Sequence, residues 1–357
     1  MANISCVPFH FETRFTDSGN IIRKIKGVGV LNYKIPIIPY NEFWLDCDTE
    51  TLYSIIYSMN QKYKVHFYEN NYTYDLLRVP SPSGEFFGEI RLHQQFIELR
   101  EKVLDIVEKR RFNNVTNAID TIKKWIENGY LVQAGVDLYY WIEGNCCYNK
   151  HHVEHYTLIH GYDEEQNKFY VMETDNECYR EFLVEEELLA TAMSEANTLA
   201  FHAFAMEIRP LHEMNQLYTV KKLVSNAKKI CRSIRPLLRD SFWVFTQDQY
   251  RQGFYRDMTV MYILQINCRM KANRLLFEYL KQYNKFSALD EVHEVCAETE
   301  KRWSTLRAGV SKLYFKENAR ERMIEQNEII RDLLKTERNM WKNFIKIGKQ
   351  IYLPEKI

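Results

Sequence analysis

The stretch HYTLIHGYDEEQNKFYVME, residues 155–173, predicts a β-hairpin. Two apolar and aromatic runs of strand length flank GYDEEQN at 161–167, which contains the Gly, Asp and Asn residues typical of turns. Two further β-rich segments lie nearby in the sequence, 131–141 upstream and 199–208 downstream. We therefore expect an antiparallel sheet in the middle of the chain.

Helical patterns precede this sheet, while the first 40 residues read as extended structure. A helix is expected to begin just after Cys47, where Asp48 or Thr49 can cap it. The same apolar spacing predicts helices at about 93–111, 115–127 (ending at Gly129) and 183–194.

The remainder of the chain is almost wholly helical in pattern. Apolar residues recur three and four apart over 215–238, 244–283, 288–315 and 318–347. The sequence therefore predicts an α+β catalytic domain at about 1–212 and an all-helical domain at about 213–357.

Composition limits the class of protein. Hydrophobic residues make up 46% of the 357 residues and no apolar run reaches the length of a membrane span, so we expect packed cores and no membrane partner. The first residues lack a basic segment followed by an apolar core, and eight cysteines are too few for a dense disulfide framework. We expect a cytoplasmic protein with reduced thiols.

The net charge of zero conceals an asymmetry. Residues 213–357 hold 28 Lys and Arg against 17 Asp and Glu, an excess of +11, and residues 1–212 hold the opposite excess of −11. Such a division indicates that the two parts meet different partners or attract each other.

Cys47 is the candidate nucleophile. A helix N-terminus carries partial positive charge, which stabilises a thiolate. The nucleophile also needs a base and a group that orients the base. His155 opens one predicted strand and Glu173 ends the next, so the hairpin brings these two positions to one end of the sheet. Asn41, six residues before Cys47, is a candidate oxyanion donor through its amide.

These residues resemble the C39-like branch of the papain superfamily, and most closely the butirosin biosynthesis protein H N-terminal family, over roughly residues 40–210. The resemblance is carried by DCD at 46–48, VDLYY at 136–140, HYTLIHGYD at 155–163 and FYVME at 169–173. It implies a papain-like fold with the order Cys, His, acid.

The chain departs from that family at two positions. The third residue of the triad is usually Asp, whereas the aligned position here is Glu173, and Asp175 lies two residues further along the chain. The oxyanion donor in related peptidases is usually Gln, whereas here it would be Asn41. Either Glu173 or Asp175 remains open as the orienting acid.

The resemblance implies an acyltransferase of thiotemplated natural-product pathways, of the butirosin type and more distantly the closthioamide type. Such enzymes take an acyl group from a carrier-protein thioester and pass it to an amine, with no cofactor. A cysteine peptidase or amidase is the alternative among enzymes, and an inactive carrier-binding protein is the alternative among binding modules.

Competing interpretations exist for the histidines. His160 is a second candidate base, but its odd spacing from His155 places it on the opposite face of a strand. The cluster HHVEH at 151–155, just after Cys146 and Cys147, has metal-ligand residue types but no standard zinc spacing, so a polar loop is the preferred interpretation and no metal is expected.

The basic half has a candidate docking helix for an acidic, phosphopantetheine-bearing carrier protein. A solvated helix face is the simpler explanation of such charge. No nucleic-acid motif is present, and the one basic run is 109–111, so nucleic acid is not expected. The candidate docking residues are Lys221, Lys222, Lys228, Lys229, Arg232 and Arg235.

Overall fold

A computed structural model of the chain has the predicted α+β architecture, with an antiparallel sheet and a helical C-terminal region. None of the helices it describes combines the length and the apolarity needed to cross a membrane. The expected extended stretch lies partly outside the described residues, at 1–22. The structure describes residues 23–27, 30–80, 86–94, 97–175, 178–209, 220–251, 253–283, 288–313 and 315–352.

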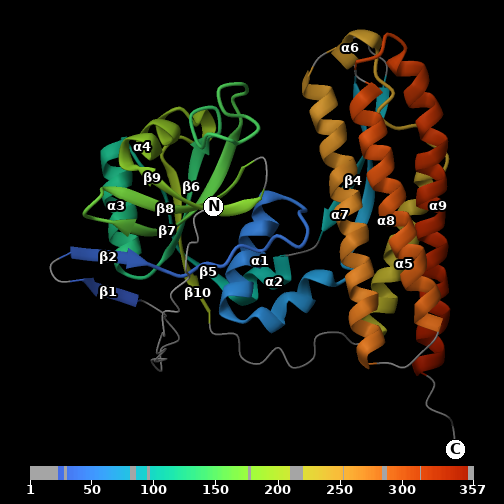
Figure 1. The fold of residues 1–357 in the computed structure, drawn as a ribbon, viewed down its shortest axis with the longest axis horizontal. Helices are drawn as coiled ribbons and strands as arrows, with labels where there is room; N and C mark the ends of the chain where they lie inside the picture. The colour runs from blue at the N-terminus through green and yellow to red at the C-terminus, as the bar shows by residue number, and fades with distance from the viewer. Residues whose placement is uncertain are drawn as a thin grey trace, which may run out of the picture. The chain divides into compact units, whose positions relative to one another are not determined.

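The chain forms two compact units, and each contains two segments of sequence (Figure 1). The first unit comprises Met1–Ile37 and Glu101–His212, and the second comprises Ile38–Arg100 and Glu213–Ile357. The functional division into a catalytic domain at 1–212 and a helical domain at 213–357 stays a prediction.

An eight-stranded antiparallel sheet forms the centre of the first unit. Its main path runs β1-β2-β7-β6-β10-β5, and β8 pairs with β7 and β9. The predicted hairpin is β7–β8, whose register places Ile159 opposite Val171 and Asp163 opposite Lys168. The strands are β1 Arg23–Gly27, β2 Val30–Lys34, β5 Leu104–Arg111, β6 Leu131–Asp137, β7 Glu154–Asp163, β8 Lys168–Thr174, β9 Tyr179–Glu185 and β10 His202–Ile208.

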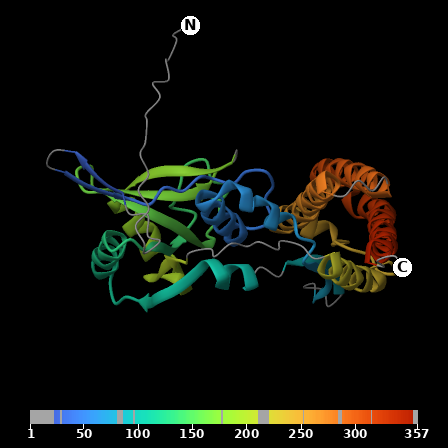
Figure 2. The ribbon, with the colours of Figure 1, turned by 90° about the horizontal axis from the view of Figure 1, so that it is seen from below.

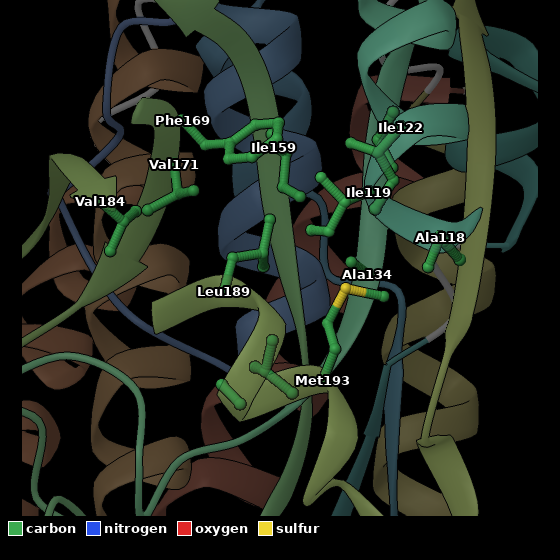
Figure 3. Close-up of a cluster of buried hydrophobic side chains, with 14 of the residues drawn as sticks. Ala118, Ile119, Ile122, Ala134, Ile159, Phe169, Val171, Val184, Leu189 and Met193 are labelled. Atoms are coloured by element: carbon green, nitrogen blue, oxygen red, sulfur yellow. The ribbon is translucent and has the colours of Figure 1, made fainter. Parts of the chain in front are cut away.

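Two helices cover one face of this sheet. Helix α3 (Val115–Glu127) packs on β6, β7 and β10, and α4 (Glu186–Ser194) packs on β6 and β9. Figure 3 shows their apolar side chains, such as Ile122 and Leu189, meeting strand residues such as Ile159. Ile159 and Val171 are paired and point toward the helices. Because side chains alternate between the two faces of a sheet, strand residues at even spacing from these two point to the same face.

Two helix predictions were wrong in part. Among the described residues of 93–111, helix is confined to α2 (Ile97–Val103), because the following residues form β5 and pair with β10 at the edge of the sheet. Within 183–194 the helix begins at Glu186, because the preceding residues complete β9 on β8. The helix predicted at 115–127 is confirmed, and Gly129 follows it with a φ of 85°, a left-handed conformation that suits glycine.

The second unit combines a β-hairpin with long helices. Strand β3 pairs with β4 along its whole length, and the hairpin packs against α5 and α7. Figure 2 shows α5 in yellow and the other long helices in orange to red. The elements are α1 Cys47–Met59, η1 Gln61–Tyr68, β3 Tyr72–Pro80, β4 Phe86–Gln94, α5 Val220–Leu237, α6 Gln247–Arg251, α7 Gly253–Tyr283, α8 Ala288–Leu313 and α9 Ala319–Tyr352.

A buried polar network ties the hairpin to α9. Tyr72 and Tyr74 each donate from their hydroxyls to one oxygen of the Glu337 carboxylate, at 2.6 and 2.7 Å. The Tyr72 hydroxyl in turn accepts from Asn273 Nδ2 at 2.8 Å and from Trp341 Nε1 at 3.1 Å. Burial raises the pKa of Glu337, although the hydrogen bonds from the two tyrosines oppose the shift.

Candidate functional site

Cys47 is the first residue of α1, and it is a half-buried thiol. The cap is Asp46 rather than Asp48 or Thr49: the backbone of Asp46 is extended and its Oδ1 accepts from Thr49 N at 2.7 Å. Because the cap lies two residues before the earlier of the two predicted positions, Cys47 itself is in the first turn. The sulfur therefore lies where the partial positive charge of the helix is largest.

The segment before Cys47 is anchored to α1. Tyr40 N donates to Ser54 Oγ at 3.0 Å, and Ile38 N donates to Ser58 Oγ at 2.7 Å. The Tyr40 ring, 1% exposed, also meets the Tyr53 ring edge-on at a centroid distance of 5.6 Å. These contacts fix the approach to the helix. Asn41 lies in this anchored segment and its side chain is exposed.

His155 and Glu173 lie together in the first unit. His155 Nε2 is 3.4 Å from Glu173 Oε1, and the two side chains are 14% and 3% exposed. His155 pairs with Val136 in β6, and Glu173 follows Val171 by two residues in β8, so both lie on the helix-covered face. A nearly dry carboxylate at this distance orients an imidazole and stabilises its charged form.

The Glu173 carboxylate has two further donors. Thr174 N donates to Oε1 at 2.9 Å, and Trp141 Nε1 donates to Oε2 at 3.1 Å. Trp141 is fully buried in the connection between β6 and β7. Both carboxylate oxygens are therefore held in place, and Trp141 is a site residue that the sequence did not reveal, since nothing in its local pattern marks a carboxylate partner.

The other candidate acid has its own partners. Asp175 Oδ2 is 2.6 Å from Arg180 Nη2, and Asp175 Oδ1 accepts from Cys178 N at 2.9 Å. These bonds join the residue after β8 to Cys178 and to Arg180 of β9. The geometry favours Glu173 as the acid that serves His155.

His160 belongs to the other face of the sheet. Its Nδ1 is 2.7 Å from Ile35 O, and its Nε2 is 3.2 Å from Glu181 Oε2. Glu181 pairs with Met172, the neighbour of Glu173, so the two carboxylates lie on opposite faces of the sheet. Burial acts to raise the pKa of Glu181, but bonds from His160 and Lys34 outweigh it and lower that pKa to about 2.

Residues 151–153 of the HHVEH cluster form a polar loop, and Glu154 and His155 begin β7. His152 Nδ1 is 2.7 Å from Asp137 Oδ2, and the ring stacks on Tyr139 at a centroid distance of 4.3 Å. Asp137 Oδ1 also accepts from Tyr139 N and Val153 N, which closes the connection between β6 and β7. Within the part of the chain that the structure describes, no three His, Cys, Asp or Glu side chains are arranged to hold a metal ion.

The structure thus unites some of the predicted site residues. His155 and Glu173 form one pair in the first unit, whereas Cys47 and Asn41 belong to the second unit. The pairing of Cys47 with His155 and the oxyanion role of Asn41 stay predictions. No protein-family model matches the chain, and no curated protein matches its sequence.

Proposed function

We propose that this protein is a papain-like cysteine acyltransferase that forms an amide in natural-product biosynthesis. Cys47 is the nucleophile, His155 the base and acid, Glu173 the orienting acid and Asn41 the oxyanion donor. The observation that carries the proposal is the His155–Glu173 pair at the ends of two adjacent strands, with a buried carboxylate whose two oxygens are both held.

The pair assigns different tasks to the two ring nitrogens of His155. Since Nε2 is directed at Glu173, Nδ1 is the nitrogen through which the ring would exchange a proton with the Cys47 thiol. A carboxylate at Nε2 favours the tautomer with the proton on that nitrogen and stabilises the imidazolium after proton transfer. This division of roles needs no metal and no cofactor.

The charges around Cys47 explain why a histidine partner matters. The N-terminus of α1 favours a thiolate, but Asp46, Asp48 and Glu50 lie in or next to its first turn and oppose it. Burial raises the pKa of Asp46, opposed by its bond with Thr49. We infer that the helix alone does not hold a thiolate, and that the imidazolium of His155 supplies the compensating charge.

The reaction would run in two steps. The Cys47 sulfur attacks the acyl carbon of a carrier-bound thioester, forming an acyl-cysteine and releasing the carrier thiol, which takes up a proton. An amine then attacks the acyl-cysteine, forms the amide and returns the Cys47 thiol. Thioester exchange is nearly isoenergetic and the second step is downhill, so neither step requires ATP.

The surface of α5 supports a carrier-protein partner. Lys221, Lys228 and Arg232 recur at spacings that keep them on one side of the helix, and α5 has no acidic residue. Arg338 of α9 donates to Cys231 O at 3.2 Å, which continues the positive charge beside α5. All six basic residues named as docking candidates are exposed, and one of them, Lys222, pairs with Glu69 at 2.8 Å.

The test is intact-protein mass spectrometry with an acyl thioester and then an amine. We expect a covalent acyl adduct on the wild type, its conversion to an amide when the amine is added, and no adduct on Cys47→Ala. A Cys146→Ala variant is the matched control and should still acylate. An adduct that persists in Cys47→Ala moves the nucleophile to another residue, with Cys146 and Cys147 next.

The same experiment separates the alternative functions. Release of the acyl group as a free acid, with no amide in the presence of amines, indicates a cysteine peptidase or amidase. Tight binding of an acyl-carrier protein with no adduct on any residue indicates an inactive carrier-binding protein.

A further inference from the structure

Cys146 and Cys147 are two adjacent thiols outside the proposed triad. Their Sγ atoms are 3.7 Å apart, with Cys146 exposed and Cys147 half-buried. Neither takes part in the acyl-transfer steps. Two thiols in van der Waals contact, one of them open to solvent, have the arrangement that thiol–disulfide exchange requires.

We infer that Cys146 and Cys147 form a reversible oxidation site that closes to a vicinal disulfide and regulates the neighbouring His155–Glu173 pair. The regulatory part of this inference rests on the proposed function, whereas the modification does not. The co-reactant is a low-molecular-weight disulfide.

The chemistry balances with that co-reactant alone. The exposed Cys146 thiolate attacks one sulfur of the small disulfide, forming a mixed disulfide and expelling one thiolate, which takes up a proton. The Cys147 thiolate then attacks Cys146 Sγ, forms the vicinal bond and expels the second small thiol. Two electrons pass from the two cysteines to the small disulfide, which leaves as two thiols.

Strain would make the bond reversible. Consecutive Cα atoms are about 3.8 Å apart, below the range of about 4.4–6.8 Å that disulfides prefer. A vicinal bond therefore closes a small strained ring, and strained disulfides are the ones that are readily reduced. A permanent structural role is not expected of such a bond.

A short chain of hydrogen bonds connects this pair to Glu173. The peptide N–H between the two cysteines, on Cys147, donates to Asn145 Oδ1 at 2.9 Å. Asn145 Nδ2 donates to Thr174 O at 3.1 Å, and Thr174 N donates to Glu173 Oε1 at 2.9 Å. Closing the ring twists the 146–147 peptide, so the Asn145 bond is the first to be lost and Thr174 loses its anchor.

The same turn has little room to absorb the twist. Cys147 O accepts from Lys150 N at 2.9 Å and from His151 N at 3.0 Å. Gly144 has a φ of 94°, and a Cβ added there would lie 3.6 Å from Asp175 Cβ, so the turn packs on the end of β8. A change in this turn is therefore transmitted to the strand end that carries Glu173.

The test is a redox titration of the full-length protein with mixtures of oxidised and reduced glutathione, followed by alkylation and tryptic digestion. Residues 125–150 form one tryptic peptide that holds Cys146 and Cys147 and no other cysteine. We expect this peptide to become 2 Da lighter and unalkylated under oxidising mixtures, and to return to the dithiol on reduction. Two alkylated cysteines throughout, or a glutathione adduct on Cys146 that is never resolved, would overturn the proposed site.

Regulation is read in the same samples as acyl transfer. We expect turnover to fall about tenfold on oxidation, because the hydrogen bond that anchors Thr174, and through it Glu173, is lost. The tryptic peptide that contains Cys47 should remain fully alkylated. Cys147→Ser should keep turnover and lose the sensitivity to oxidant. Oxidation of the pair with unchanged turnover would overturn the coupling. A reduced protein without any turnover counts against the proposed function alone, because the digest still reads the thiols.

Discussion

Replacing Glu173 with Gln tests the acid of the proposed triad by an exchange of nearly equal volume. The two oxygens of Glu173 accept from Thr174 N and Trp141 Nε1 at 2.9 and 3.1 Å, whereas Gln has one oxygen and one NH₂. Whichever way the amide turns, its NH₂ meets one of these N–H donors. One buried donor then has no acceptor, which costs about 1–3 kcal/mol of unfolding free energy.

The same exchange removes the charge beside His155 Nε2. Acylation of Cys47 should then slow by about 10²- to 10⁴-fold, the range that general acid–base catalysis contributes. We would measure acylation by rapid quench and mass spectrometry, stability by urea unfolding, and donor binding separately in a Cys47→Ala background, where binding should not change.

Asp175→Asn is the matched control for this substitution. It keeps an acceptor for Cys178 N and loses an ion pair with Arg180, whose side chain is 53% exposed. Its acylation rate should stay near that of the wild type, with a stability loss of about 1–3 kcal/mol because the Asp175 side chain is only 5% exposed. Normal acylation in Glu173→Gln together with a large loss in Asp175→Asn would refute the assignment of the acid.

Three further predictions concern the second unit, the docking helix and pH. Tyr72→Phe removes a hydroxyl that bonds to three partners, whereas Tyr74→Phe removes one that bonds to Glu337 alone. Urea unfolding should therefore show a loss of about 3–5 kcal/mol in unfolding free energy for Tyr72→Phe and about 1.5–3 kcal/mol for Tyr74→Phe, and equal losses would contradict the network. Raising salt from about 50 to 500 mM shortens the Debye length from roughly 14 to 4 Å, so acylation by a carrier-bound donor should slow more than acylation by a small thioester. Charge reversal of two basic residues on α5 should act in the same direction, and equal sensitivity of both donors would contradict the carrier proposal. The pKa of Glu181 in the folded protein is depressed to about 2, so its carboxylate should stabilise the fold above its unfolded pKa and lose that effect as pH falls toward 2. The unfolding free energies of wild type and Glu181→Gln should therefore converge at low pH, and a constant difference from pH 7 to pH 2.5 would count against this ion pair.

The sequence predicted those parts of the fold that depend on local pattern. The predicted turn at 161–167 and the flanking apolar runs were enough for the β7–β8 hairpin, although β7 continues to Asp163 and the turn covers only 164–167. Gly129 was enough for the end of α3. The β5 strand was mistaken for helix because its pairing with β10 joins residues about a hundred positions apart. Such an edge strand gains its conformation from its partner rather than from its own periodicity.

The candidate site divides in the same way. The positions of His155 and Glu173 at the ends of two strands follow from hairpin geometry, and the odd spacing of His160 predicted that it would lie on the opposite face. The choice between Glu173 and Asp175, and the presence of Trp141, depend on side-chain directions in a connecting turn. Periodicity carries no information about those directions, so only the structure supplies it.

The way in which the chain alternates between its two units has a consequence for protein synthesis. Residues 38–100 leave the ribosome early, but Tyr72 and Tyr74 of this segment meet their carboxylate partner on α9, which is translated much later. While more than two hundred residues are added, the Tyr72 and Tyr74 hydroxyls can bond only to water, and the β3–β4 surface that packs on α5 and α7 has no cover. Every strand that the structure describes in the first unit is complete by Ile208, so this unit can fold before the second one is finished. Production of the protein should accordingly depend on chaperones that shield the early hairpin, and a ribosome stalled before α9 should yield a chain with one folded and one unfolded unit.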